Sequence, residues 1–96
     1  MIDASAAFRR TLAAHAAAAG CPVETLCVEA RDWASATFVG QQHRLHLRAP
    51  AGPALSAWMV GLPEVEWRLS GYIVIYVAAE LRDDAIVITA LTIHDN

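Results

Sequence analysis

The chain contains no lysine, and all seven of its basic residues are arginines. Ten acidic residues outnumber them, so the formal net charge is −3 at pH 7. Proteins that bind DNA or RNA draw their affinity from clustered cations that neutralise phosphates, whereas these arginines are scattered along the chain. The sequence therefore predicts a protein that does not bind nucleic acid.

Cysteine is also scarce, with only Cys21 and Cys27 present. The two do not form a CxxC pair, and no histidine or further cysteine lies near them at the spacing of zinc ligands. If residues 22–31 form a strand, the two cysteines lie about 20 Å apart, at about 3.3 Å per residue, which is beyond the reach of a disulfide. We expect two reduced thiols, and we expect no metal or other cofactor.

Long apolar runs and catalytic motifs are missing as well. No uncharged run reaches the roughly 18 residues that a membrane-spanning helix needs. The chain has no nucleophile elbow, phosphate-binding loop, dinucleotide-binding fingerprint or HExxH motif. The sequence thus predicts no membrane span and favours a protein without catalytic residues.

Residues 9–21 leave one alternative open about location. This segment, RRTLAAHAAAAGC, has the basic start, apolar middle and small-residue end of a lipoprotein export signal. Against that interpretation, Asp3 precedes the arginines, His15 interrupts the apolar middle, and Ala18 stands where such signals usually carry leucine. We expect a cytoplasmic protein, with export as the alternative.

What the chain does have is hydrophobicity, since 56% of its residues are apolar. A chain of 96 residues suits one domain, and a domain of this size buries roughly 65% of its unfolded surface. Disordered chains show the opposite composition, with low hydrophobicity and high charge. We therefore expect residues 1–96 to form a single folded domain.

The first helix is predicted over residues 3–19, where apolar side chains recur at the three- and four-residue steps of one helical face. Asp3 or Ser5 is suited to cap its start, and Gly20 to close it. A second, short helix is predicted to begin at Pro53, a residue that suits the first helical position. Apolar residues follow at helical spacing as far as Leu62, and Gly61 and Pro63 end the element.

Alternation of apolar and polar residues predicts strands elsewhere. They are expected over 23–31 and 36–49, with a turn at 31–35 and a bulge or bend at Gly40, and strand character is expected to resume at 64–69. Two apolar, β-branched runs then follow.

The two final runs meet at Asp83 and Asp84, which suit a two-residue hairpin turn because aspartate tolerates positive φ. The elements together predict an α+β fold of order α-β-β-α-β-β. We expect an antiparallel sheet of about four curved strands with two helices mainly on one face.

The stretch HRLHLR, residues 43–48, carries the most suggestive polar side chains. Successive residues of a strand point to opposite faces, so His43 and His46 cannot hold one metal ion while the strand stays regular, and only a bulge would bring them together. Arginine pairs with carboxylate or phosphate, so the face that carries His46 is a candidate site for an anionic ligand or an acidic peptide. This candidate binding surface consists of Arg44, His46, Arg48, Tyr72 and Tyr76.

The last two strands are apolar on both faces, whereas a sheet with one wet face alternates apolar with polar residues. Two helices cover about one face of a four-stranded sheet, so a second copy of the chain is the simplest cover for the other face. Alternatively, the helices divide between the two faces, or the sheet curls until its faces shield each other. The predicted dimer interface consists of Val74, Tyr76, Val87, Leu91 and Ile93.

These inferences predict a homodimeric binding or assembly module without catalysis, with a protein or peptide as a possible further partner. The alternative is a small enzyme or anion-binding protein that uses Arg44, His46, Arg48 and Tyr76. The simpler interpretation of those side chains is a polar rim around an apolar dimer interface.

Overall fold

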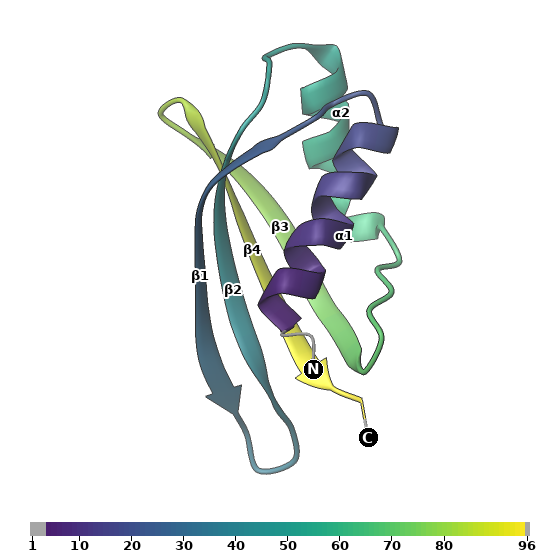
Figure 1. The fold of residues 1–96 in the computed structure, drawn as a ribbon, viewed down its shortest axis with the longest axis vertical. Helices are drawn as coiled ribbons and strands as arrows, with labels where there is room; N and C mark the ends of the chain where they lie inside the picture. Colours follow the sequence, from purple (N-terminus) through teal and green to yellow (C-terminus); the bar gives the residue numbers. More distant parts are fainter. Residues whose placement is uncertain (1–3, 96) are drawn as a thin grey trace.

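The computed structural model describes residues 4–95, which form two α-helices, one short 3-10 helix and four strands. In chain order the elements are α1 (Ala4–Ala18), β1 (Glu24–Ala34), β2 (Val39–Arg48), α2 (Pro53–Gly61), η1 (Leu62–Glu64), β3 (Tyr72–Arg82) and β4 (Ala85–His94). The predicted α+β class and the order α-β-β-α-β-β are confirmed. Both helices lie on the same side of the sheet (Figure 1).

α1 forms because an alanine-rich segment places Phe8, Leu12 and Ala16 on one face, and all three are buried. The predicted cap Asp3 lies outside the described residues. Ser5, the other candidate, lies within the helix and is buried, so it does not cap the start.

The end of α1 follows the prediction. Gly20 has a φ of 78°, which glycine adopts at little cost. This conformation lets the Cys21 N–H donate to the Ala16 carbonyl at 2.9 Å and the Gly20 N–H donate to the Ala17 carbonyl at 3.1 Å. These two bonds make up a Schellman cap, which satisfies carbonyls that the helix leaves without partners.

All strand pairs in the sheet are antiparallel, and the strand order is β1-β2-β4-β3. β2 and β4 therefore occupy the centre, and β1 and β3 form the two edges. Leu45 and Leu47 of β2 lie beside Ile88 and Ile86 of β4 and are buried with them under the helices. The core thus lies between the helices and the central strands.

The hairpin between β3 and β4 turns at the predicted position. Asp83 has a φ of 53°, and Arg82 pairs with Ala85 across the turn. From there the predicted register holds as far as the pair Tyr76–Leu91.

A bulge at Ile75 then shifts the register, so that Val74 pairs with Thr92. An inserted residue reverses the faces of all residues beyond it. Tyr72 and Val74 therefore lie on the helix-covered face, and Ile73 lies on the opposite face.

Three local predictions are wrong. β1 continues through Ala34, so 31–34 is strand, and the turn lies at 35–38, where the Phe38 N–H donates to the Ser35 hydroxyl at 3.0 Å. Gly40 pairs regularly with both neighbouring strands, and neither a bulge nor a register shift occurs there.

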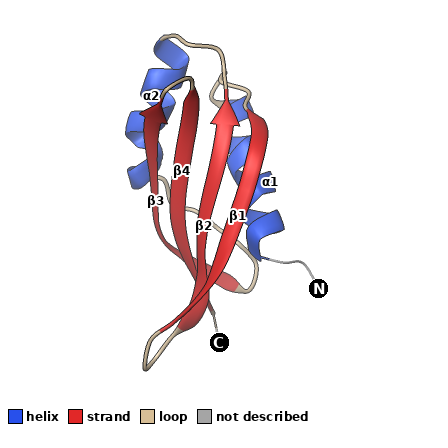
Figure 2. Cartoon of the chain, turned by 90° about the vertical axis from the view of Figure 1, so that its left-hand side faces the viewer, coloured by secondary structure: helices blue, strands red, loops and turns tan. Residues whose placement is uncertain are grey.

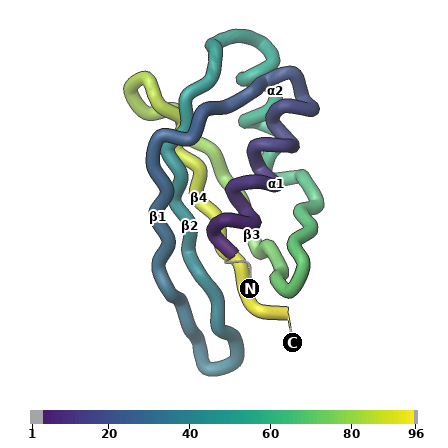
Figure 3. The backbone as a smooth tube through the Cα atoms, in the orientation of Figure 1, coloured from purple at the N-terminus to yellow at the C-terminus, as the bar shows by residue number. Residues whose placement is uncertain are grey.

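Residues 64–69 form no strand. Glu64 ends η1, and the irregular chain that follows reaches the start of β3 with a single bridge between Leu69 and Tyr72 (Figure 3). The alternation in this segment reflects packing. Trp67 and Leu69 are half-buried against the core and Val65 is also half-buried, while the residues between them are exposed.

Candidate interaction surface

The sheet face opposite the helices, called the open face below, has no helix over it within residues 4–95 (Figure 2). The strand register defines its members, because directly paired residues of antiparallel strands share a face. Arg44 pairs with Glu29 on one side and Thr89 on the other, and His46 pairs with Cys27 and Val87. The open face therefore runs across all four strands.

Four of the five predicted binding residues lie on the open face, and one does not. Arg44, His46 and Arg48 alternate along β2, and Tyr76 reaches the same face from β3. Tyr72 lies on the helix-covered face, where its ring is 5.2 Å from that of His94. The prediction for Tyr72 is wrong because nothing in the sequence signals the bulge at Ile75.

The predicted dimer interface is also divided. Tyr76, Val87, Leu91 and Ile93 lie on the open face, whereas Val74 packs against the core under the helices. Its place on the open face is taken by Ile73, which is 45% exposed.

Two predicted interface residues are already covered within the monomer. Val87 and Ile93 are each only 5% exposed, since they lie on the central strand β4 between side chains of β2 and β3. Tyr76 and Ile73 of β3 are large apolar side chains of the open face that remain exposed. The uncovered patch is therefore smaller and closer to the sheet edge than the sequence predicts.

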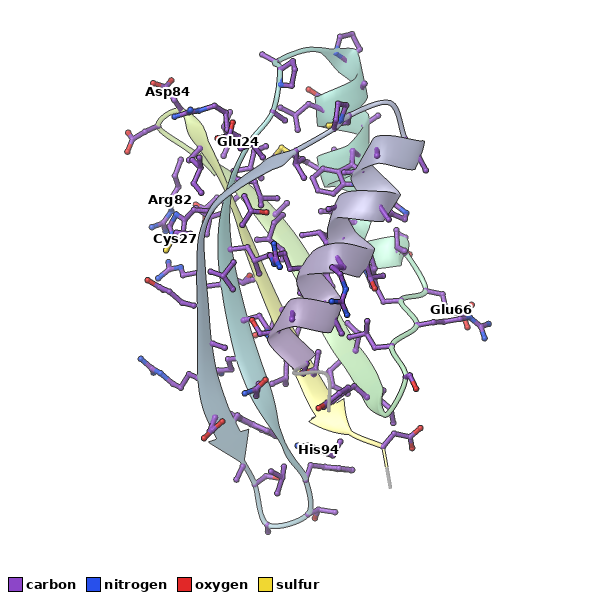
Figure 4. The ribbon with its side chains drawn as sticks, in the orientation of Figure 1. Glu24, Cys27, Glu66, Arg82, Asp84 and His94 are labelled. Carbon is purple, nitrogen blue, oxygen red and sulfur yellow. The ribbon has the colours of Figure 1, made fainter. Side chains whose placement is uncertain are left out.

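Charges of both signs surround this patch. Glu24 pairs directly with Arg48, and Glu29 with Arg44. Opposite charges at directly paired positions attract each other and stabilise a sheet by up to about 1 kcal/mol. Figure 4 shows Glu24, Cys27 and Arg82 on the side of the sheet away from the helices. Each of the two arginines that the sequence offered for anion binding thus has a carboxylate beside it.

A shallow depression of about 560 Å³ crosses the middle of the open face. All four strands contribute polar side chains to it, namely Glu29, Arg31, Gln42, Arg44, Tyr76 and Thr89. Only Arg44 and Tyr76 were predicted. The other four were missed because their proximity depends on the strand order, which the sequence does not reveal.

Two of the histidines lie beside polar side chains within the fold. His15 Nδ1 accepts a hydrogen bond from Trp58 Nε1 at 3.0 Å, and His43 Nε2 lies 2.8 Å from the Thr92 hydroxyl in the core. Residues 4–95 contain no group of three or more histidine, cysteine, aspartate or glutamate side chains that could hold a metal ion.

The two thiols differ in environment. Burial raises the pKa of the Cys21 thiol, which favours its neutral form. Cys27 is exposed on the open face beside His46.

No protein-family model, curated protein or solved structure matches the chain. Neither described helix is long and apolar enough to cross a membrane. The interpretation of the open face therefore rests on its own side chains and on the sheet that holds them.

Proposed function

We propose that the protein is a non-catalytic, homodimeric binding or assembly module that acts in the cytoplasm. The observation that carries the proposal is the one-sided covering of the sheet: both helices lie on one face, and the opposite face exposes Ile73 and Tyr76. Apolar side chains that a chain leaves exposed together mark surfaces of association.

The charge pattern of the open face favours a second copy as the partner. A two-fold axis places one surface against itself, so a surface with a single sign of charge would repel its own copy. The open face carries both signs, as the pairs Glu24–Arg48 and Glu29–Arg44 show. Apolar side chains near a polar, charged surround are the usual arrangement of a protein interface. The rest of the open face would then be available to bind a further protein or peptide partner.

The oligomeric state of the intact chain tests this proposal. We expect light scattering coupled to gel filtration to give twice the 10.3 kDa mass of the chain. Tyr76→Glu should weaken the dimer, because it places a charge in the exposed apolar patch. Val60→Glu is the matched control, since Val60 lies on α2 and is 80% exposed. A native chain that is monomeric at every concentration would refute the proposal.

The depression on the open face favours a second candidate, a module that binds a small anion. Arg31 and Arg44 line it together with the hydroxyl groups of Tyr76 and Thr89, and these donors suit a carboxylate or phosphate. Titration calorimetry with inorganic phosphate and with citrate tests this candidate. Binding that Arg44→Gln abolishes, in a chain that stays monomeric, would favour the anion-binding module over the dimer.

A further inference from the structure

The two edges of the sheet differ in charge. β1 carries Glu24, Glu29, Arg31 and Asp32, and charged side chains are a common means of blocking edge-to-edge pairing. β3, at the other edge, has no charged residue over 72–79. β1 therefore carries charges along much of its length, whereas β3 carries them only at Glu80 and Arg82 and is interrupted by the bulge at Ile75. The stretch 76–79 is the uncharged and regular part of the β3 edge.

β3 also concentrates large exposed hydrophobic side chains. Ile75 is 51% exposed, Tyr76 45% and Leu81 61%. Ile75 and Leu81 stand at equal separations in the sequence on either side of Ala78. In an antiparallel pair of identical strands, residues equally spaced about the centre lie opposite each other. Pairing centred on Ala78 would thus bring the two most exposed large hydrophobic side chains of β3 together.

We infer that a second copy of the chain pairs with the β3 edge, antiparallel and with the two-fold axis at Ala78. The inference rests on the proposed homodimer but places its contact at the β3 edge, so most of the open face stays uncovered and free for a further partner. The two four-stranded sheets then form one continuous sheet, and the helices of both copies lie on the same side of it. This mode of association supplies partners for backbone N–H and C=O groups at an otherwise open edge.

The side chains suit this register. Ile75 lies opposite Leu81 of the partner subunit, and the symmetric contact repeats on the other side of the axis. Tyr76 lies opposite Glu80 of the partner subunit, so the phenol O–H can donate to that carboxylate. Ala78 meets its own copy, and its small side chain lets the strands approach at the axis.

Alternative registers are less favourable. A shift of the axis to Ala79 places Ile75 opposite Asp83 of the partner subunit, in the hairpin turn, and moves Leu81 away from Ile75 to a position opposite Val77, which is already buried in its own subunit. It also brings the two Glu80 carboxylates diagonally close across the axis, where they repel each other. The Ala78 register avoids both problems.

Reciprocal charge substitution tests the register. We expect Ile75→Lys and Leu81→Glu, each alone, to raise the dimer Kd about tenfold to a hundredfold, because each places a charge against an apolar partner on both sides of the axis. The double variant I75K/L81E should recover most of the affinity, since Lys at position 75 then faces Glu at position 81 of the partner subunit. Val60→Lys is the control for an added charge on an exposed apolar residue of α2.

The outcomes separate this inference from the proposed function. A native dimer that both single variants leave unchanged would overturn pairing at β3 and leave a dimer through the open face standing. A double variant no tighter than the single variants would overturn the register. A native monomer would overturn the homodimer and the β3 pairing together.

A cross-link provides a second measurement that does not depend on tolerance of the charged variants. Directly paired Cα atoms in antiparallel strands lie about 4.5–5.5 Å apart, within disulfide range. In a Cys27→Ser background, Ala78→Cys should give a covalent dimer with oxidised glutathione, as seen on a non-reducing gel. Val60→Cys in the same background should not. A native dimer whose Ala78→Cys variant fails to cross-link would refute the inferred axis.

Discussion

Trp58 of α2 donates its indole N–H to Nδ1 of His15 of α1 at 3.0 Å, so one hydrogen bond joins two helices that are distant in sequence. The His15 ring also lies 4.9 Å from that of Trp67, whose Nε1 is buried without a hydrogen-bond partner among residues 4–95. The two indole N–H groups therefore provide a matched pair, one bonded and one not.

Replacement of each tryptophan by phenylalanine should separate these roles. We expect Trp58→Phe to lower the free energy of unfolding by about 1–3 kcal/mol, because it removes the bond to His15 as well as part of a buried ring. Trp67→Phe should cost less, because the N–H that it removes gains no hydrogen bond in the folded state. Urea denaturation followed by circular dichroism measures both values. Equal losses would contradict a stabilising role for the Trp58–His15 bond.

Gly40 lies where β2 comes close to β4. A Cβ at this position would overlap the carbonyl oxygen of Thr92, so Gly40→Ala requires a shift of the central strands. We expect it to destabilise the fold by about 1–3 kcal/mol. Gly61→Ala is the control, because its added Cβ meets no atom within 4 Å and its φ of −81° suits alanine. Thermal unfolding of both variants tests the prediction, and an unchanged melting temperature for Gly40→Ala would refute it.

The two thiols should react at different rates with Ellman's reagent. Cys27 is exposed and should react at once, whereas Cys21 is 3% exposed and should react only as the chain opens. The stoichiometry should rise from one thiol to two on addition of denaturant. Rapid reaction of two thiols in the native chain would contradict the burial of Cys21. In the Cys27→Ser variant only the slow reaction of Cys21 should remain.

The raised pKa of Cys21 also predicts how stability depends on pH. The unfolded thiol ionises near its ordinary pKa of 9.0, and the folded thiol at a higher pH because burial disfavours the thiolate. Between those two values the unfolded chain binds fewer protons, so the free energy of unfolding falls as pH rises above about 9. Cys21→Ala should reduce that slope, which denaturation at several alkaline pH values would measure. If Cys21→Ala leaves the slope unchanged, groups other than Cys21 cause the loss of stability at alkaline pH.

The sequence predicts the helices and the final hairpin well, because their signals are local. Gly20 ends α1, Pro53 begins α2, and Asp83 turns the last hairpin, each through its own backbone preference. Residues 64–69 show the weakness of alternation as a signal. An extended segment that packs every second side chain against a core alternates apolar and polar residues just as a strand does. The pattern is the same whether or not another strand pairs with the segment.

The candidate surface was harder to predict because it depends on contacts between distant segments. The bulge at Ile75 contains neither glycine nor proline to signal it, yet it moves Tyr72 and Val74 to the other face. The burial of Val87 and Ile93 depends on which strands flank β4. That strand order becomes visible only when the two halves of the chain are brought together.

The central place of β4 has a consequence for the order in which the protein forms. β4 follows the other three described strands in sequence, yet it lies between β2 and β3 and joins the two hairpins into one sheet. Before β4 has been synthesised, α1 and the first hairpin lack the core contacts made by Ile86 and Ile88. Leu45 and Leu47 are then exposed to water on the side that β4 later covers. Stable folding of the sheet must therefore wait until β4 has been synthesised.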